Sequence, residues 1–352
     1  MSGVHDRTVT VTGGSGMLGG NLVRHLAADG WQVRSVDLRP PAEPVPGVDH
    51  VLADVRDTAR VRAALTGTHA VVHTAAALPS YPEPEIRSII VDGTRNVLDA
   101  ARTAGVERVV HISTTAVYGL PRQVPTTEDH PRSPVDPYSR AKAAAEEIGE
   151  RWRAAGMCVP MLRPKTFLGP GRMGLFAMLF EWAEEGRNFP VLGRGDVRIQ
   201  MFAVEDLVDA VTAALHAPPD RANDTFNLGA AEFGTIREDF QAVLDAAGHG
   251  KRVIPIPARP AVAVLQLLER LRLSPVYGRL IHKLLDDSYV SIDKAEEVLG
   301  WRPRYTNRDA ILRTYRWWRA NRAAATAAGP STGRTSREPW KQGVLGLAKA
   351  VF

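Results

Sequence analysis

Thr12-Gly13-Gly14-Ser15-Gly16-Met17-Leu18-Gly19 is the stretch around which the rest of the chain is organised. It follows an apolar, β-branched run from Val9 to Val11 and precedes a segment whose Leu22, Val23 and Leu26 fit one helix face. A strand, a glycine-rich turn and a helix in this order predict a site for the pyrophosphate of a dinucleotide. The anion would lie on the unsatisfied N–H groups and the positive dipole end of the new helix.

The three glycines of this turn have distinct expected roles. Gly13 lets the chain turn sharply, Gly16 lets backbone N–H groups approach the pyrophosphate, and Gly19 lets the helix pack closely on the strand. The residues between them are further expected cofactor contacts: Ser15, Met17 and Leu18. The spacing is not the Gly-x-Gly-x-x-Gly of most dehydrogenases, and a chain with 30 glycines also forms turns of purely structural use. Taken alone, the pattern leaves both interpretations open.

An acidic residue lies where a ribose-binding carboxylate is expected. The run Gln32 to Val36 predicts a second strand that ends at Asp37, 18 residues after Gly19. The carboxylate would accept hydrogen bonds from both hydroxyls of the adenosine ribose and repel a 2′-phosphate, which favours NAD over NADP. Arg39 argues the other way, because an arginine at this place can accommodate that phosphate. A plain turn residue at the end of a strand is the alternative interpretation of Asp37.

The third predicted strand, Val51 to Val55, ends beside the expected adenine. Asp54 and Val55 are candidate cofactor contacts there, since the Asp54 carboxylate would reach the adenine amino group. An N-cap for a helix that starts near Asp57 is an equally good interpretation of Asp54.

A fourth predicted strand, Ala70 to His73, is followed by small residues. Ala75 and Ala76 would let a flat cofactor lie against the edge of the sheet, and Ala77 is a candidate substrate contact. His73 lies inside an apolar strand, so we expect a core histidine rather than a catalytic one.

Strands and helices alternate up to about residue 165, which predicts an α/β protein with a Rossmann-type, doubly wound parallel sheet. The later members of this alternation are helices at 86–104 and 138–153 and strands at 108–112 and 159–163. We expect residues 1–165 to form the dinucleotide-binding domain and residues 166–322 mainly a smaller α/β substrate-binding domain. Parts of the second segment, around 195–230, would return to the first domain.

The second half of the chain has weaker local signals. Its expected elements are helices at 174–186, from 204 and at 261–285, and a short strand at 226–228. Asp293 is expected to cap a helix, with Glu296 as the capping-box acid and Gly300 at the end. The three aromatic residues of the last helix are expected to pack in the core: Tyr315, Trp317 and Trp318.

The C-terminal residues 323–352 predict a flexible linker followed by a short amphipathic helix. The linker is rich in Ala, Thr, Gly, Ser and Pro, and apolar residues then recur on one face between Trp340 and Phe352. Such a helix would contact a membrane surface, a partner or its own domain.

Composition narrows the class of protein. The chain has 352 residues, 44% of them hydrophobic and 24% charged, which is ordinary for a soluble globular protein. The single cysteine, Cys158, excludes a cysteine metal cluster and favours a reducing, cytoplasmic setting. The net charge of +5 comes from scattered arginines without a basic stripe, so we expect no nucleic-acid partner. The N-terminus runs straight into the first strand, and no apolar run reaches the length of a membrane span.

Tyr138 and Lys142 are the candidate catalytic pair of the chain. They are one helical turn apart, so their side chains share a face. A phenol normally titrates near ~10, and a nearby ammonium favours the phenolate and lowers that pKa. Such a tyrosine can take the proton of a secondary alcohol while hydride leaves its carbon for NAD⁺. Lys142 would also bind the nicotinamide ribose, and Thr114, just past the fifth strand, would hold the reacting oxygen.

With these residues the chain resembles the extended short-chain dehydrogenases/reductases of the NAD-dependent epimerase/dehydratase superfamily. The resemblance runs from about Thr8 to Arg319. It rests on the glycine turn, Asp37, Ser113-Thr114-x-x-Val117-Tyr118-Gly119, Tyr138-x-x-x-Lys142, Arg163-Pro164, Gly169-Pro170-Gly171, Arg198 to Asp206 and Leu299-Gly-Trp-Arg-Pro303. It implies Tyr138 as the catalytic acid/base, Lys142 as its activator and Thr114 as the hydroxyl partner. Tyr138, Lys142 and Pro164 are also implied cofactor contacts. It also implies NAD as the cofactor, a small-molecule substrate, no metal and a homodimer.

Departures from the family pattern bear on the substrate. Thr115 and Ala116 replace the Asp and Glu of sugar 4,6-dehydratases, so elimination of water is not expected. Thr166 and Ala203 replace an asparagine and a histidine that are usual in sugar-nucleotide enzymes. The expected substrate contacts are Ala77, Thr114, Thr115, Thr166 and Arg198.

Three functions therefore stay open at this point. The first is an epimerase-type enzyme for a nucleotide sugar, and the second a dehydrogenase or reductase of an apolar alcohol, resembling the 3β-hydroxysteroid dehydrogenases. The third is a binding protein that senses NAD(H) without turnover.

Overall fold

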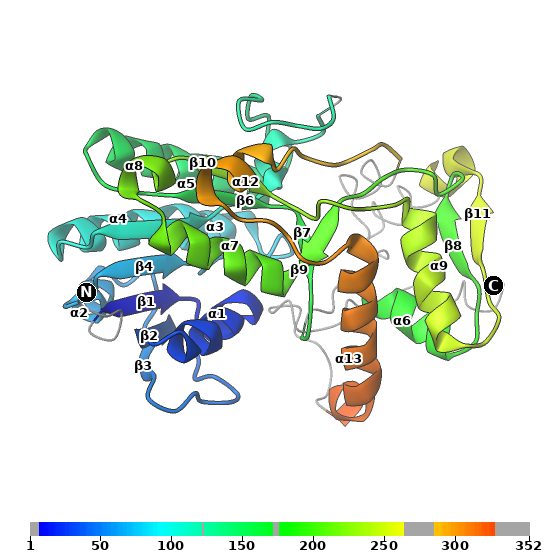
Figure 1. The fold of residues 1–352 in the computed structure, drawn as a ribbon, viewed down its shortest axis with the longest axis horizontal. Helices are drawn as coiled ribbons and strands as arrows, with labels where there is room; N and C mark the ends of the chain where they lie inside the picture. The colour runs from blue at the N-terminus through cyan, green and yellow to red at the C-terminus, as the bar shows by residue number, and fades with distance from the viewer. Residues whose placement is uncertain (1–6, 122, 172–175, 264–284, 328–352) are drawn as a thin grey trace.

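A seven-stranded parallel sheet forms the larger part of the protein (Figure 1). The structure is a computed structural model that describes residues 7–121, 123–171, 176–263 and 285–327. The strand order is β10-β6-β5-β4-β1-β2-β3. The bounds are β1 (Thr8–Thr12), β2 (Gln32–Asp37), β3 (Asp49–Leu52), β4 (Ala70–His73), β5 (Arg108–Ile112), β6 (Met161–Pro164) and β10 (Thr225–Leu228). The order reverses direction at β1, so the predicted doubly wound Rossmann-type fold is confirmed.

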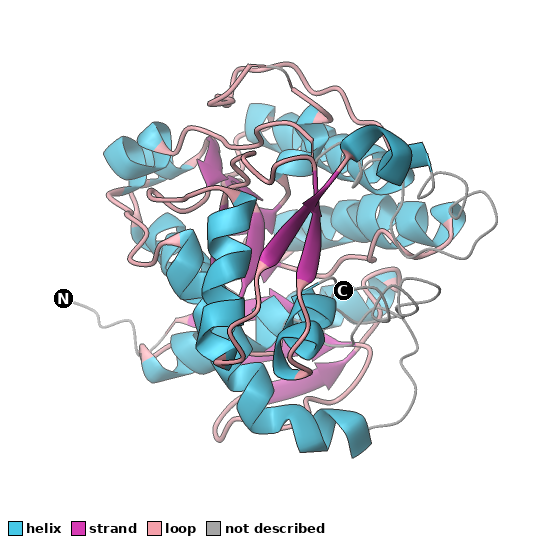
Figure 2. Ribbon diagram, turned by 90° about the vertical axis from the view of Figure 1, so that its right-hand side faces the viewer, coloured by secondary structure: helices cyan, strands magenta, loops and turns pink. Residues whose placement is uncertain are grey.

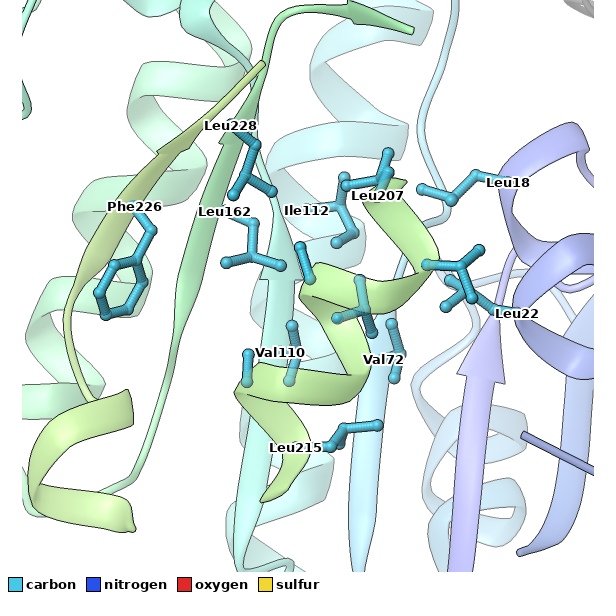
Figure 3. Close-up of a cluster of buried hydrophobic side chains, with 14 of the residues drawn as sticks. Leu18, Leu22, Val72, Val110, Ile112, Leu162, Leu207, Leu215, Phe226 and Leu228 are labelled. Atoms are coloured by element: carbon cyan, nitrogen blue, oxygen red, sulfur yellow. The ribbon is translucent and has the colours of Figure 1, made fainter. Parts of the chain in front are cut away.

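Helices cover both faces of this sheet, which is why its strands are apolar on both sides. One face packs against α1 (Met17–Ala28), α7 (Val204–His216) and α12 (Asp293–Leu299). Figure 3 shows the core on this side, in which Leu22 of α1 and Leu207 of α7 lie over Val72 and Val110 of the sheet. The other face packs against α2 (Thr58–Leu65), α4 (Gly93–Thr103) and α5 (Pro137–Ala154).

The third strand is shorter than the predicted Val51 to Val55. β3 ends at Leu52, because the chain turns there and the N–H of Asp57 donates to the carbonyl of Asp54 at 2.9 Å. The predicted strand at 159–163 likewise begins later, at Met161.

The helix predicted at 86–104 is interrupted by a π-helical turn. α3 (Glu83–Arg87) continues into the π segment η2 (Ser88–Asp92) and then into α4. The N–H of Gly93 donates to the carbonyl of Ser88, five residues back. A Cβ on Gly93 would lie 2.7 Å from Val55 Cγ2. The helix therefore approaches the turn after β3 at a residue without a side chain, a contact that periodicity cannot reveal.

A smaller part, on the right of Figure 1 and in front of the sheet in Figure 2, is built around a second core. Its strands β8 (Phe189–Leu192) and β11 (Val253–Ile256) are parallel. They pack with α6 (Phe176–Glu184), α9 (Ile236–Ala247) and α13 (Asn307–Ala327). Tyr315 and Trp318 are buried in this core, as predicted, and stack on each other at 6.4 Å between ring centroids. Trp317 is half-buried and lines a pocket of about 230 Å³ beside the glycine turn.

The chain passes between the two parts several times. β7 (Thr166–Leu168) pairs with β9 (Met201–Ala203), and α7 and β10 then return to the large sheet. α9 and β11 belong to the smaller core, α12 packs on β10 and α7, and α13 belongs to the smaller core again.

Asp206 at the start of α7 explains the Leu299-Gly-Trp-Arg-Pro303 pattern. Its buried carboxylate accepts hydrogen bonds from the N–H groups of Arg304 (2.9 Å) and Tyr305 (3.2 Å). Its carbonyl accepts one from the indole N–H of Trp301 at 2.9 Å. The pattern therefore fastens the last part of the chain to α7.

Three predictions for the second half need correction or fall outside the described residues. α12 begins at Asp293 with Ile292 at the N-cap, so the predicted Asp293 cap is wrong; Asp293 instead bonds with the Ser291 hydroxyl, although Gly300 does end the helix. α13 runs to Ala327, so the first five residues of the predicted linker are helical, as the high helix propensity of alanine allows. Most of the predicted helix at 261–285, and residues 328–352, lie outside the described residues. Among the helices that the structure describes, none is long and apolar enough to cross a membrane.

Candidate active site

The glycine turn is packed too closely for larger residues. Gly13 has φ +73°, and its N–H donates to the carbonyl of Val36 at 2.7 Å. A Cβ on Gly13 would lie 2.8 Å from the backbone N of Ala75, and a Cβ on Gly19 only 2.0 Å from the carbonyl oxygen of Gly13. Gly16 is the N-cap of α1 and has no side chain to cover the first N–H groups of that helix. The turn thus fits a bound pyrophosphate, and Ala75 lies against it.

Asp37 holds the glycine turn from the end of β2. Its carboxylate accepts hydrogen bonds from the backbone N–H of Ser15 (3.1 Å) and of Arg39 (3.2 Å). The Ser15 hydroxyl donates to the carbonyl of Arg39 at 2.7 Å. Asp37 therefore does act as a turn residue toward Arg39, but it also links the turn after β2 to the phosphate-binding turn, where a ribose would lie.

Replacing Asp37 by alanine removes these acceptors and the charge. Because a hydrogen bond to a charged group contributes about 1.5–3 kcal/mol, we expect NAD affinity to fall about tenfold or more and the preference for NAD over NADP to narrow. Isothermal titration calorimetry with both dinucleotides measures this. Asp49→Ala, which removes a carboxylate paired with Arg34 on the neighbouring strand, is the matched control. Unchanged NAD affinity in Asp37→Ala would contradict the ribose assignment.

Asp54 does not cap the following helix. Asp57 is itself the N-cap of α2 and accepts hydrogen bonds from the N–H groups of Ala59 and Arg60. Asp54 is paired with Arg56, whose guanidinium lowers the pKa of the carboxyl through hydrogen bonds and charge. The capping interpretation of Asp54 is therefore wrong, while its contact with adenine stays a prediction.

His73 is a core residue, as predicted. It is 2% exposed, and its ring nitrogens lie 2.7 Å from Thr12 Oγ1 and 3.1 Å from Thr94 Oγ1. Ala77, the predicted substrate contact after β4, is buried.

The carboxyl end of β5 and the start of α5 bring the three predicted catalytic residues near one another in the fold. α5 starts with a capping box between Asp136 and Ser139, which fixes the backbone around the half-buried Tyr138. Lys142, one turn later, is 4% exposed and donates from Nζ to the carbonyl of Ile112 at 2.8 Å. Thr114 follows two residues after Ile112 and accepts a hydrogen bond from the N–H of Ala116. The structure therefore holds the Lys142 ammonium at the carboxyl end of β5, two residues before Thr114 and one helical turn from Tyr138.

Burial lowers the pKa of Lys142 to about 8, against the opposing charge of Glu146. The lysine is therefore still an ammonium at neutral pH and can favour the phenolate of Tyr138. The lowered pKa of Lys142 also makes the free energy of unfolding depend on pH. Between about pH 8 and the ordinary lysine value of about 10.4, the unfolded chain holds a proton that the folded protein has lost.

The free energy of unfolding should therefore gain a contribution from Lys142 as pH rises through this window, with a slope of at most about 1.4 kcal/mol per pH unit. Lys142→Met removes that contribution. Urea unfolding of both proteins from pH 7 to 10.5 measures this contribution: the free energy of unfolding of the wild type, minus that of Lys142→Met, should increase as pH rises. A pH-independent difference would show that the lysine pKa is not displaced.

A buried ion-pair network under α5 was not predicted from the sequence. Glu146 has no exposed side-chain surface and accepts hydrogen bonds from Arg163 Nε (2.9 Å) and Nη2 (2.7 Å). The hydroxyl of Ser113 and the guanidinium of Arg132 also donate to it. Arg163 in turn donates to the Tyr118 hydroxyl at 2.7 Å. The one signal in the sequence is that Glu146 follows Lys142 by four residues and so shares its helix face.

The predicted substrate contacts differ in their exposure and in their partners. Thr115 is buried, with its hydroxyl 3.4 Å from the carbonyl of Pro164, whereas Thr166 is exposed at the start of β7. Arg198 is paired with Asp287 at 2.8 Å and lies over the ring of Tyr289. Arg198 is thus a fixed cation in the smaller part, and Thr115 is fixed to the strand end that carries Pro164.

Comparison with known proteins identifies the family of the chain. Residues 9–229 match the model of the NAD dependent epimerase/dehydratase family. An uncharacterised protein, y4nG of Sinorhizobium fredii, is 37% identical over 97% of this chain and 85% of its own. A UDP-glucose 4-epimerase of Mycolicibacterium smegmatis is 31% identical over 88% of this chain and 97% of its own. Sterol demethylase protein B of Methylococcus capsulatus is 31% identical over 72% of this chain and 78% of its own.

Solved structures share the fold. MoeE5, in complex with UDP-glucuronic acid and NAD, matches with a TM-score of 0.73 and 26% identity over 89% of this chain and 99% of that chain. The chain therefore belongs to the NAD-dependent epimerase/dehydratase family of extended short-chain dehydrogenases/reductases, and it is an NAD-dependent enzyme.

Proposed function

We propose that this enzyme moves hydride at a secondary alcohol or ketone, with Tyr138 as the acid/base. The observation that carries the proposal is the buried Lys142 ammonium, which is held on the carboxyl end of β5 one helical turn from Tyr138. Bound NAD supplies the hydride acceptor or donor. The glycine turn and Asp37 hold its pyrophosphate and adenosine ribose.

Each residue has a defined task in this mechanism. The Lys142 charge favours the phenolate of Tyr138, which takes the proton of the substrate hydroxyl. The Thr114 hydroxyl holds the reacting oxygen during this transfer. In the reverse direction the phenol of Tyr138 gives its proton back to the carbonyl oxygen.

For the substrate we propose first a nucleotide sugar, with an epimerase outcome. The UDP-glucose 4-epimerase relative supports it, since the alignment covers nearly the whole length of both chains. Arg198, a partly exposed cation on the smaller part that is paired with Asp287, would meet a diphosphate there. In an epimerase the hydride returns to the other face of the ketone, so NAD undergoes no net change.

A second candidate is the oxidation or reduction of an apolar alcohol. Ala203 is buried and offers no polar group, and Thr166 is shorter than the asparagine usual there. The sterol demethylase relative has the same identity as the epimerase, over a shorter part of the chain.

Purified protein distinguishes these candidates. An epimerase should retain NAD through purification and interconvert UDP-glucose and UDP-galactose without added cofactor. A dehydrogenase should instead reduce added NAD⁺ with a 3β-hydroxysterol, seen as the rise in reduced-nicotinamide absorbance. Binding of NAD without turnover of any hydroxyl substrate in a broad panel would contradict both and favour a sensor.

A further inference from the structure

Two buried histidines lie next to the backbone that holds Lys142. His73 of β4 and His111 of β5 are partners in the parallel register, so their side chains leave the same face of the sheet. Their ring centroids are 5.5 Å apart, and both residues are almost fully buried. The carbonyl that accepts the hydrogen bond from Lys142 belongs to Ile112, the residue after His111.

The two rings differ in their partners. Both nitrogens of His73 lie within hydrogen-bond distance of threonine hydroxyls, those of Thr12 and Thr94. Both nitrogens of His111 are buried, yet neither has a hydrogen-bond partner among the residues that the structure describes. Buried polar atoms in native proteins bond to the protein or to ordered water. The part of the chain that the structure describes therefore leaves both ring nitrogens of His111 open to a water molecule.

Both rings are neutral, which leaves one acceptor nitrogen on each. Burial, with the charge of Lys142 as the second cause, lowers the pKa of His73 to about 3 and that of His111 well below its ordinary range. The charged and titratable groups that act on His111 are Lys142 and Arg153 of α5 and His73 of β4. Glu146 of α5 acts on Lys142 from the other side.

We propose that His111 is a positioning residue for Lys142: its acceptor nitrogen binds a buried water, and this water accepts a hydrogen bond from the Lys142 ammonium. The inference rests on the proposed role of Lys142 beside Tyr138. An ammonium carries three N–H groups, and the carbonyl of Ile112 takes one of them. A water held by His111 takes a second one without adding a negative charge. It thereby opposes the effect of burial and keeps the lysine charged at the pH where Tyr138 works.

Two leucine variants separate this role from simple packing. In His111→Leu, no protein group loses a hydrogen-bond partner and only the bridging water is lost, so we expect a smaller fall in melting temperature than in His73→Leu. In His73→Leu, the hydroxyls of Thr12 and Thr94 lose their partner, so the melting temperature should fall. Equal losses in both variants would show that His111 has a protein partner and would overturn the proposal.

The titration of Lys142 is the direct test. It can be followed by NMR of the unliganded protein with ¹³C-labelled lysine, using Lys142→Met to assign the signal. We expect the midpoint in His111→Leu to drop by about one pH unit, and His111→Gln, which keeps an acceptor, to restore most of it. The alkaline limb of the kcat/KM profile should move by the same amount, with little change in KM for NAD.

A midpoint in His111→Leu that equals the wild-type value would overturn the proposal. So would a high-resolution crystal structure without a water between Lys142 Nζ and the His111 ring. Neither result depends on turnover. Failure of the proposed function would show separately, as activity that survives the loss of the Tyr138 hydroxyl.

Discussion

Replacing Tyr138 by phenylalanine lowers kcat/KM by about two to four orders of magnitude, the typical contribution of a general acid–base. The residual activity loses the acid limb of its pH profile, because the group that must be deprotonated is gone. The half-buried ring and the capping box of Asp136 and Ser139 are unchanged by the substitution, so the fold and NAD affinity stay intact. Steady-state kinetics from pH 5 to 10, with calorimetry for NAD, measure all three quantities.

Tyr305→Phe is the control for loss of a phenol elsewhere in the chain. Tyr305 lies just before α13 and is bound through its backbone N–H to Asp206, so loss of its hydroxyl should change kcat/KM less than twofold. Full activity in Tyr138→Phe would contradict the assignment of Tyr138 as the acid/base, whether the enzyme is an epimerase or a dehydrogenase.

Replacing Glu146 by glutamine destabilises the protein by about 3–5 kcal/mol, the range found when one partner of a buried ion pair is removed. The side chain is fully buried, and Arg163 would be left without its charged partner. Burial alone would raise the pKa of Glu146, but the hydrogen bonds and charge of Arg163, with Ser113 and Arg132, lower it overall. The carboxylate is thus charged at neutral pH, and its contribution is lost only as pH falls through that lowered pKa.

Urea unfolding at pH 7 measures the effect. Glu147→Gln, at the next and exposed position of the same helix, is the matched control and should stay within about 0.5 kcal/mol of the wild type. A double variant, Glu146→Gln with Arg163→Met, should regain part of the stability lost by the single change, since the unpaired buried cation is removed. If Glu146→Gln costs no more than Glu147→Gln, the network does not stabilise the fold.

Local patterns predicted the strands around the glycine turn well, because each signal lies within a few residues. β2, β4 and β5 have the predicted start, and the turn lies where Gly13 and Gly19 require it. The spacing of Tyr138 and Lys142 likewise needs only helical geometry.

What the sequence did not reveal depends on contacts between distant segments. The π turn before Gly93 arises where that residue meets Val55, and the carboxylate of Asp206 finds its partners about 98 residues later in the chain. Glu146 looks like an ordinary helix residue until Arg163 of β6 lies beside it. His111 follows two valines in β5, and only the surrounding structure shows that its ring nitrogens have no hydrogen-bond partner among the described residues. Such features follow from packing, which local periodicity does not encode.

The repeated passage of the chain between its two parts has a practical meaning for protein engineering. Segments from β7 to β9, from α9 to β11 and along α13 build the smaller core, while β10 and α12 between them complete the larger one. A chimera that borrows the smaller part from a relative must exchange all three segments together. A fragment truncated after β6 would lack β10 and leave β6 as an unpaired apolar edge, which is a known route to aggregation. The smaller part therefore cannot be exchanged as one continuous piece of sequence.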